Sequence, residues 1–170
     1  MSEVLFLTNE EMGARWEAIE AALRAAFRGA RFIDSGYTLD TPVKHTRKGI
    51  DGELRGGLGL GHVLAVDGDR VLGGLFCVPT ERTPDEITRD VRWCDVGWVF
   101  VSHDAERDDR AWIMDTLLKR AFAALREAGF EQIVTNMGTR AGAQSLGSYG
   151  FVDKSTDEQP NRWVRDLTGS

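Results

Sequence analysis

The sequence predicts an α/β fold, in which a mixed central β-sheet is flanked by helices within a single domain over residues 1–170. Three observations support this prediction. Strand-like apolar runs alternate with segments of helical periodicity. In the second half, a strand, a long helix and another strand follow one another, as in a parallel crossover. With 42% hydrophobic and 28% charged residues, a chain of 170 residues can bury one sizeable core.

The first third of the chain predicts a strand, a helix and an irregular stretch. Residues 3–8, EVLFLT, form the strand. One amphipathic helix follows and ends at Gly29, and its apolar residues are Met12, Trp16, Ile19, Leu23 and Phe27. Residues 34–61 contain glycines, Pro42 and a basic cluster, which favours loops and one lip of a binding site. The GLGLG segment within them resembles part of a dinucleotide motif but lacks the required strand and helix around it.

The rest of the chain predicts a hairpin, a central strand and a βαβ unit. HVLAV and VLGGLFCV flank DGDR, a turn of a length suited to antiparallel strands. RWCDVGWVFV, residues 92–101, is apolar on both faces, as expected of a central strand. A helix over residues 105–128 ends at Gly129, and its apolar stripe is Met114, Leu117, Leu118, Ala121, Phe122 and Leu125. FEQIVTN predicts a strand, RAGAQSLGSY a short helix, and GFV and RWVRDL the closing strands.

The composition excludes several classes of function. The net charge is −6 without a basic run or basic–aromatic pattern, so nucleic acid is not an expected partner. No apolar run reaches the roughly 18 residues of a membrane span, and the start lacks a signal-peptide pattern, so we expect a cytoplasmic protein. Cys77 and Cys94 fit no metal or redox spacing, and we expect buried thiols. The histidines, His45, His62 and His103, are scattered, so no metal site is expected.

The order of elements and several motifs of the second half resemble the GNAT superfamily of N-acetyltransferases. The matching pieces are the strand ending in VFV, the helix with Leu117 and Leu118, REAGFEQIV, Asn136, AQSL and Gly150–Phe151. The resemblance covers residues 60–152 and reaches the N-terminal part by element order alone. It implies a GNAT-like domain and an N-acyltransferase that uses acetyl-CoA or another acyl-CoA as co-substrate. The implied partner is a small amine or amino-acid-like acceptor, which the acidic surface would steer if cationic, with a homodimer left open.

The turn between the central strand and the long helix, HDAERDDRAW, departs from the family pattern because it contains no glycine. Glycines in such turns let a pyrophosphate approach the N–H groups of the helix start. Trp112 occupies a family glycine position under either alignment register. The resemblance implies contacts to acyl-CoA from the strand backbone, from arginine side chains and from the start of the helix. The residues concerned are Phe100, Val101, Arg107, Arg110, Ala111, Trp112 and Asn136. The acidic residues of the turn fit equally well an ordinary helix start, which acidic side chains stabilise.

Three residues are candidates for proton transfer in acyl transfer. Asp95 lies on the central strand between tryptophans, where a raised pKa would suit a base, although a solvent-facing or Arg92-paired acid is the alternative. His103, at the strand end, could relay a proton through water or simply be solvated. Tyr149 stands two residues beyond the position of the family's frequent general acid, and packing in the core is its alternative role.

Two further classes of function remain open at this point. A GNAT-fold protein that has lost acyl-CoA binding would act as a ligand-binding or interaction module, which the glycine-free turn favours. An enzyme of the same fold with different chemistry would use Asp95 or His103 as its base.

Overall fold

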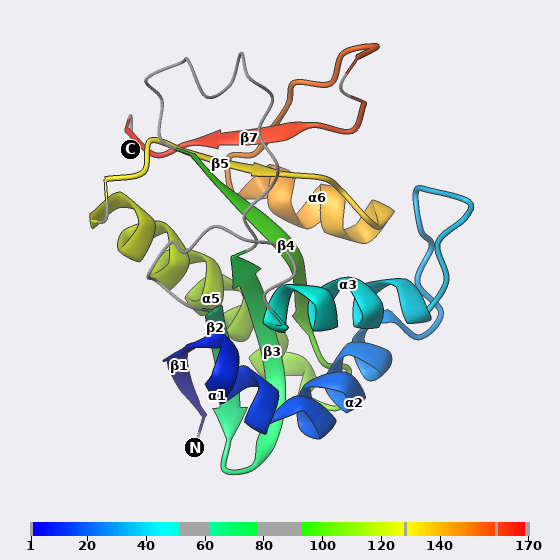
Figure 1. Ribbon diagram of the computed structural model, residues 1–170, viewed down its shortest axis with the longest axis vertical. Coiled ribbons are helices and arrows are strands. Elements are labelled where there is room, and N and C mark those ends of the chain that lie inside the picture. Colours follow the sequence, from blue (N-terminus) through cyan, green and yellow to red (C-terminus); the bar gives the residue numbers. More distant parts are fainter. Residues whose placement is uncertain (1, 52–61, 78–92, 128, 159, 169–170) are drawn as a thin grey trace.

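A computed structural model of the chain describes residues 2–51, 62–77, 93–127, 129–158 and 160–168. Within these residues, seven strands form one mixed sheet in the order β1-β2-β3-β4-β5-β7-β6 (Figure 1). All neighbouring strands are antiparallel except β4 and β5, which are parallel. The mixed α/β sheet predicted from the sequence is therefore confirmed. The strands are β1 Glu3–Leu7, β2 His62–Asp67, β3 Arg70–Cys77, β4 Trp93–Val101, β5 Gln132–Thr135, β6 Val152–Asp153 and β7 Trp163–Asp166.

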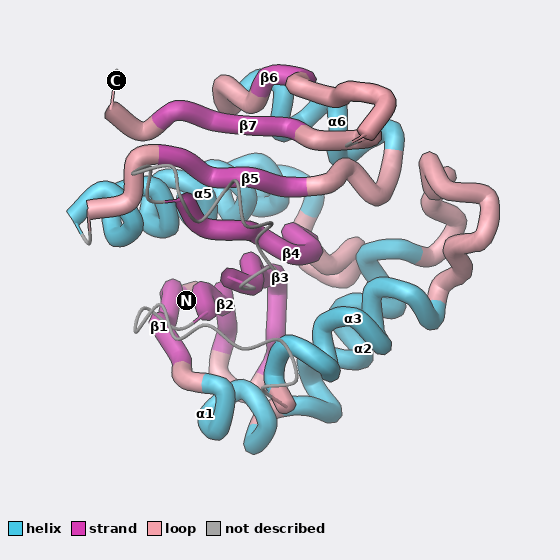
Figure 2. The backbone as a smooth tube through the Cα atoms, turned by 45° about the horizontal axis from the view of Figure 1, so that its top comes forward, coloured by secondary structure: helices cyan, strands magenta, loops and turns pink. Residues whose placement is uncertain are grey.

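Helices cover both faces of the sheet. Figure 2 shows α1, α2 and α3 together on one side of strands β1 to β4, with α5 on the other. Successive residues of β2 face these two layers alternately: Val63 and Ala65 pack with α5, whereas Leu64 and Val66 pack with α1 to α3. The helices are α1 Asn9–Ala14, α2 Trp16–Phe27, α3 Asp40–Ile50, α5 Arg107–Glu127 and α6 Arg140–Ser148.

The long helix α5 forms for the reason that its sequence indicates. Its apolar residues recur at three- and four-residue spacing and are buried against the sheet: Ile113, Leu117, Leu118, Ala121, Phe122 and Leu125. Gly129 follows the helix in the left-handed conformation, with φ of 87°, as a C-terminal cap requires. Met114, the first residue of the predicted stripe, is only half-buried. The helix predicted over residues 105–128 is confirmed, with its start at Arg107.

Two predictions for the N-terminal third are wrong. The single helix expected before Gly29 is two helices, because the backbone leaves the helical region at Arg15. The segment expected to form loops contains α3. Pro42 does not break this helix because it lies in the first turn, where the N–H that proline lacks would have no helical partner. The GLGLG segment and the side chains of Cys77 and Cys94 lie outside the described residues.

An extra residue in β4 bends this strand at the centre of the sheet. Leu75 of β3 pairs with Val99, but Cys77, two residues later, pairs with Val96, three residues earlier. This two-against-three register is a β-bulge, and it interrupts the strict alternation of faces along β4. The parallel pairing of β4 with β5 extends only from Trp93 to Asp95. Beyond Asp95 the two strands separate, which opens the sheet between them.

In the described part of the chain, we find no helix with the length and hydropathy needed to cross a membrane.

Truncating the core of α5 should destabilise the domain. Leu118 is 1% exposed, so Leu118→Ala is expected to lower the free energy of unfolding by about 2–5 kcal/mol through the cavity it leaves. Arg120→Ala, at an exposed position of the same helix, is the matched control and should change it by less than about 0.5 kcal/mol. Urea denaturation measures both values. Equal effects of the two substitutions would contradict the burial of this stripe.

Acid should destabilise the fold through His62, which is 4% exposed. Its Nε2 lies 2.6 Å from Asn9 Oδ1, its Nδ1 has no partner among the described residues, and burial lowers its pKa to about 4. The unfolded chain takes up this proton near pH 6.5 and the folded chain only near pH 4, so stability falls as the pH drops between these values. We expect the wild type to lose about 3 kcal/mol more than His62→Gln between pH 7 and pH 4 in urea denaturation. Parallel pH profiles of the two proteins would contradict this assignment.

Candidate active site

The separation of β4 and β5 opens a cleft with a volume of about 430 Å³. Its walls come from α2, α3, β3, the bulged part of β4, Met114 of α5, the end of β5 and α6, with the connections next to them. The lining residues are Phe27, Tyr37, His45, Thr46, Lys48, Phe76, Gly97, Trp98, Val99, Met114, Thr135, Asn136, Met137, Gly138, Thr139, Gly142, Ser145, Leu146 and Asn161. The cleft therefore reaches both layers of helices through the opened sheet.

The C-terminal part of β4 has backbone groups that no described strand pairs on the side of β5; Val99 of this part lines the cleft, and Val101 lies just beyond the lining. The Ser102 N–H donates to the Leu72 carbonyl at 2.7 Å, so the backbone at Ser102 faces β3. Alternation along the strand then directs Phe100 toward β3 as well, and Val99 and Val101 toward β5. No described strand pairs with β4 on that side beyond Asp95. The N–H and C=O groups of Val99 and Val101 are thus available to an extended ligand.

An aromatic cluster lies on the side of the cleft that faces α2 and α3. Trp98 is its centre, and four other rings have centroids within 6.2 Å of the Trp98 ring. These separations are typical of favourable aromatic pairs. The cluster joins four parts of the chain, since Phe27 belongs to α2, Phe32 and Tyr37 to the following connection, His45 to α3 and Trp98 to the bulge of β4.

A hydrogen bond between Trp98 and His45 fixes the protonation pattern of the imidazole. Trp98 Nε1–H donates to His45 Nδ1 at 3.2 Å. Because Nδ1 accepts, the proton of the neutral ring resides on Nε2, which is then a donor. Partial burial and the positive charge of Lys48 lower the pKa of His45. His45 is therefore neutral at pH 7 and offers an N–H group rather than a charge.

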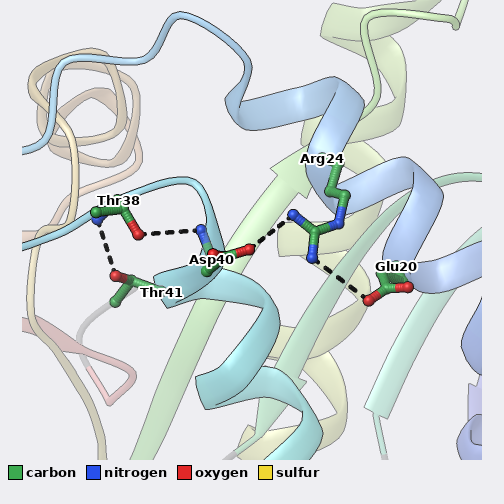
Figure 3. A network of polar contacts seen from close by, with 5 residues as sticks. All are labelled: Glu20, Arg24, Thr38, Asp40 and Thr41. Carbon is green, nitrogen blue, oxygen red and sulfur yellow. Dashed lines mark hydrogen bonds and ion pairs between the residues drawn. The ribbon is translucent and has the colours of Figure 1, made fainter.

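Polar contacts fix the start of α3 against α2 (Figure 3). Arg24 of α2 donates to Asp40 at 2.9 Å and also contacts Glu20 at 3.5 Å. At the start of α3, the Thr38 hydroxyl accepts the Asp40 N–H, and the Thr41 hydroxyl accepts the Thr38 N–H. The bond to Asp40 satisfies an N–H group that the helix start leaves open, and the bond to Thr38 fixes the residue before the N-cap. They hold α3, and with it His45, at the wall of the cleft.

The connection between β5 and α6 closes the far end of the cleft. The Gly138 carbonyl accepts the Ile33 N–H at 3.0 Å, and Phe32 forms a β-bridge with Thr139. Asn161 secures the same connection, since its side chain accepts from the Met137 N–H and donates to the Met137 carbonyl. Residues 31–33 and 137–139, far apart in the sequence, are therefore bonded to each other, and the second of these segments lines the cleft.

The turn before α5 is held by its own side chains. The Ser102 hydroxyl accepts the Asp104 N–H at 3.1 Å, and Arg70 of β3 donates to the Asp104 carbonyl. Arg110, expected to grip phosphate, donates to the carbonyls of Ala105 at 3.0 Å and His103 at 2.5 Å. Two of its donors are thus engaged in stabilising the turn. The turn's outer surface consists of exposed side chains, which include Asp104, Glu106, Arg107, Asp108, Asp109, Ala111 and Trp112.

The structure brings only some of the predicted site residues to the cleft. Asn136 lines it and is exposed, whereas Phe100 is buried beneath it and stacks on Phe76. His103 is exposed in the turn and lies outside the cleft lining. Asp95 lies in β4 at the last pair with β5, and its side chain is outside the described residues.

Tyr149, a candidate general acid with core packing as its alternative role, follows the end of α6 and does not belong to the lining of the cleft. Its hydroxyl donates to Asp115 Oδ1 of α5 at 3.3 Å, and Asp115 also pairs with Lys119 at 2.9 Å. Burial, followed by the negative charge of Asp115, raises the pKa of Tyr149. In this arrangement Tyr149 joins α6 to α5.

Comparison with solved structures identifies the architecture. An N-acetyltransferase PaiA from Thermoplasma acidophilum, solved with coenzyme A, matches over 98% of this chain and 99% of its own, with a TM-score of 0.64 and 12% identity. A GNAT family acetyltransferase from Brucella melitensis, solved with acetyl-CoA, matches over 100% and 90%, with a TM-score of 0.65 and 16% identity. This is the GNAT fold. The C-terminal condensation domain of Ebony, in complex with beta-alanyl-dopamine, also matches over 98% and 99%, with a TM-score of 0.64 and 12% identity. No protein-family model and no curated protein matches the sequence.

Within this GNAT fold, sequence reasoning missed the residues that shape the side of the cleft next to α3. Tyr37, His45 and Lys48 lie in the segment predicted to form loops. At the level of the sequence, Trp98 is a flank of Asp95 and one of five tryptophans that could supply an aromatic pocket or pack in the core. The prediction that the loop segment forms one lip of a binding site did point to Tyr37, His45 and Lys48, because connecting segments often carry the residues of binding sites. Their convergence on Trp98 depends on α3 and the bulge, which the sequence pattern did not indicate.

Gly138 should be indispensable for the position of Trp98. A Cβ atom at Gly138 would lie 2.2 Å from the Trp98 ring, whereas a Cβ at Gly147 of α6 would meet nothing within 4 Å. We expect Gly138→Ala to destabilise the protein by about 1–3 kcal/mol through overpacking. Gly147→Ala, the matched control, should be neutral or stabilise α6 by up to about 1 kcal/mol.

Thermal unfolding monitored by circular dichroism measures these changes. In a Trp98→Leu background the cost of Gly138→Ala should largely disappear, because the clash partner is gone. An undiminished cost in that background would show that Gly138 acts independently of Trp98.

Proposed function

We propose that this chain is an acyl-CoA-dependent N-acyltransferase that transfers an acetyl or other acyl group to a small amine. The observation that carries the proposal is the opening between β4 and β5, where Val99 and Val101 present unpaired backbone groups beside the start of α5. Neighbours of the same fold have been solved with coenzyme A and acetyl-CoA. That likeness supports the proposal at the level of the fold.

The pantetheine arm of an acyl-CoA fits the free edge of β4. An extended amide-bearing arm pairs with Val99 and Val101 as an additional strand, and such pairing depends little on side-chain identity. Met114 of α5 and Leu146 of α6, which line the opening, supply apolar contacts for the arm. Asn136 at the end of β5 is an exposed polar partner for the same ligand.

Amine acylation requires stabilisation of the thioester oxygen and removal of one proton. A backbone N–H of the bulged part of β4 is suited to the first task, because it is fixed and costs no reorganisation. For the second, the candidates remain Asp95, at the base of the opening, and His103, through water. His45 lines the cleft and is neutral at pH 7, but its Nδ1 already accepts the Trp98 N–H.

The turn before α5 is the weakest part of the proposed site. N–H groups at the helix start suit a pyrophosphate, but the exposed acids next to them oppose its charge. This composition favours one second candidate function, a GNAT-fold binding module that does not take up acyl-CoA. The two functions differ in whether coenzyme A binds at all.

Neutralising the turn should strengthen coenzyme A binding. We expect Asp108→Asn/Asp109→Asn to bind coenzyme A about 2- to 10-fold more tightly than wild type at low salt, with a smaller gain at high salt. The control is Asp157→Asn/Glu158→Gln, which neutralises two exposed acids in the loop after β6. It has the same net charge as the turn variant but leaves the turn unchanged, so it should not bind coenzyme A more tightly than wild type. Calorimetric titration measures the affinities, and acetyl-CoA should also raise the melting temperature of wild type.

The outcomes separate the two candidate functions. Tight binding by wild type with no effect of neutralisation would mean that the acids do not oppose the ligand, and the acyltransferase proposal would stand. Absence of binding in all three proteins would contradict it and favour the binding module.

A further inference from the structure

The side of the cleft next to α3 differs chemically from the side next to α5 and α6. Aromatic side chains form its walls, namely those of Phe27, Tyr37, Phe76 and Trp98. Flat apolar walls of this kind can enclose an apolar group of the size of one ring. Such a group gains binding free energy from the apolar area it buries and from favourable ring–ring geometry. We call these four residues, together with His45, Thr46 and Lys48, the acceptor pocket.

The acceptor pocket carries positive charge and no described carboxylate. Lys48 is the one side chain with a full charge among the described residues that line the cleft. The acidic residue of α3, Asp40, pairs with Arg24, and Asp51, which follows the helix, pairs with Arg47 at 3.1 Å. Lys48 forms no ion pair within the described part of the chain. No described residue therefore competes with a ligand anion for its ammonium group.

The neighbouring polar groups of α3 also act as donors. The Trp98 N–H occupies His45 Nδ1, so that the neutral ring presents the Nε2–H. The hydroxyl of Thr46, a residue that is 2% exposed, is buried without a partner among the described residues. One ammonium, one imidazole N–H and one unused hydroxyl on a single helix match a ligand group rich in acceptors. A carboxylate has this property, whereas a second ammonium group does not.

We propose that the acceptor is a small amine that also carries a carboxylate and a ring-sized apolar body, as an aromatic α-amino acid does. Lys48 pairs with the carboxylate, and the rings around Trp98 enclose the body. This inference rests on the proposed acyl transfer. In that reaction the amine nitrogen forms a bond to the thioester carbonyl carbon, the C–S bond breaks, and the proton lost by the amine balances the thiolate, which gives an amide and a thiol.

The charge of Lys48 has a second effect on such an acceptor. A nearby cation repels the ammonium group of a protonated amine. A carboxylate on the same molecule compensates the repulsion on binding. An acceptor with several ammonium groups lacks this compensation and is excluded by the same field. The overall acidity of the chain would attract such a molecule to the surface, but the pocket would not retain it.

The test compares matched ligands by direct calorimetric binding, without acyl-CoA. Phenylalanine and phenethylamine share ring and amine but differ in the carboxylate, and alanine retains the carboxylate without the ring. Wild type should bind phenylalanine about 10-fold more tightly than either of the others, as expected for one charged hydrogen-bonded contact or one buried ring. Lys48→Met should weaken phenylalanine binding about 10-fold and should not weaken phenethylamine binding, because it removes only a repulsion of the phenethylamine ammonium group.

Lys44→Met is the control variant. Lys44 is an exposed lysine on the same helix that does not line the cleft, so its replacement should change neither affinity. Circular dichroism verifies that both variants remain folded. Equal affinity of wild type for phenylalanine and phenethylamine, tighter binding of phenethylamine or spermidine, or equal effects of the two lysine substitutions would overturn the inference.

Failure of the acceptor assignment is distinguishable from failure of the proposed function. If phenylalanine binds through Lys48 but coenzyme A does not bind and no N-acetylphenylalanine forms, the pocket assignment stands and the acyltransferase proposal fails. If acetyl-CoA binds and phenethylamine is acetylated in preference to phenylalanine, the acyltransferase proposal stands and the pocket assignment fails.

Discussion

The extra residue in β4 is the constraint on which the rest of the site depends. The ladder between β4 and β5 ends after three paired residues on each strand, and β5 itself ends at Thr135, one residue beyond the last pair. Directly after these pairs, the bulge between Val96 and Val99 bends β4. The unsatisfied backbone groups that result would be costly in a closed interior, but here they line a cleft accessible to ligand or water. The interruption of strand pairing thus leaves the edge of β4 that we propose as the binding site for acyl-CoA.

Trp98 links this backbone feature to the helices that complete the cleft. It belongs to the bulged segment, and its ring lies against Gly138 on the opposite wall. Its N–H engages His45 of α3, whose start is in turn fixed to α2 by Arg24. Each of these contacts is modest alone, with a net contribution of about 0.5–1.5 kcal/mol per hydrogen bond. Together they determine where α3 lies relative to the sheet.

The sequence predicted those elements whose stability is encoded locally. The DGDR turn, the apolar stripe of α5 and Gly129 each specify a conformation within a few residues, and the structure agrees. Helix α3 escaped prediction because Pro42 and several polar residues obscure its pattern, and because contacts with α2 hold it, including Arg47 over the ring of Trp16 at 5.1 Å. The acceptor pocket could not be predicted from the sequence for a related reason. Tyr37, Lys48 and Trp98 are distant in sequence, and a bulge leaves no periodic signal.

The position of α3 in the chain has a consequence for how such a protein can diversify. Residues 28–50 connect α2 to the part of the chain that precedes β2, and none of them belongs to a strand of the sheet. The ladder from β1 to β6 fixes the edge of β4, but it does not depend on which side chains α3 presents. Exchange of a few residues on this helix would therefore alter ligand preference while the hydrogen-bonded framework stays in register. Selection can act on recognition and on the scaffold almost separately.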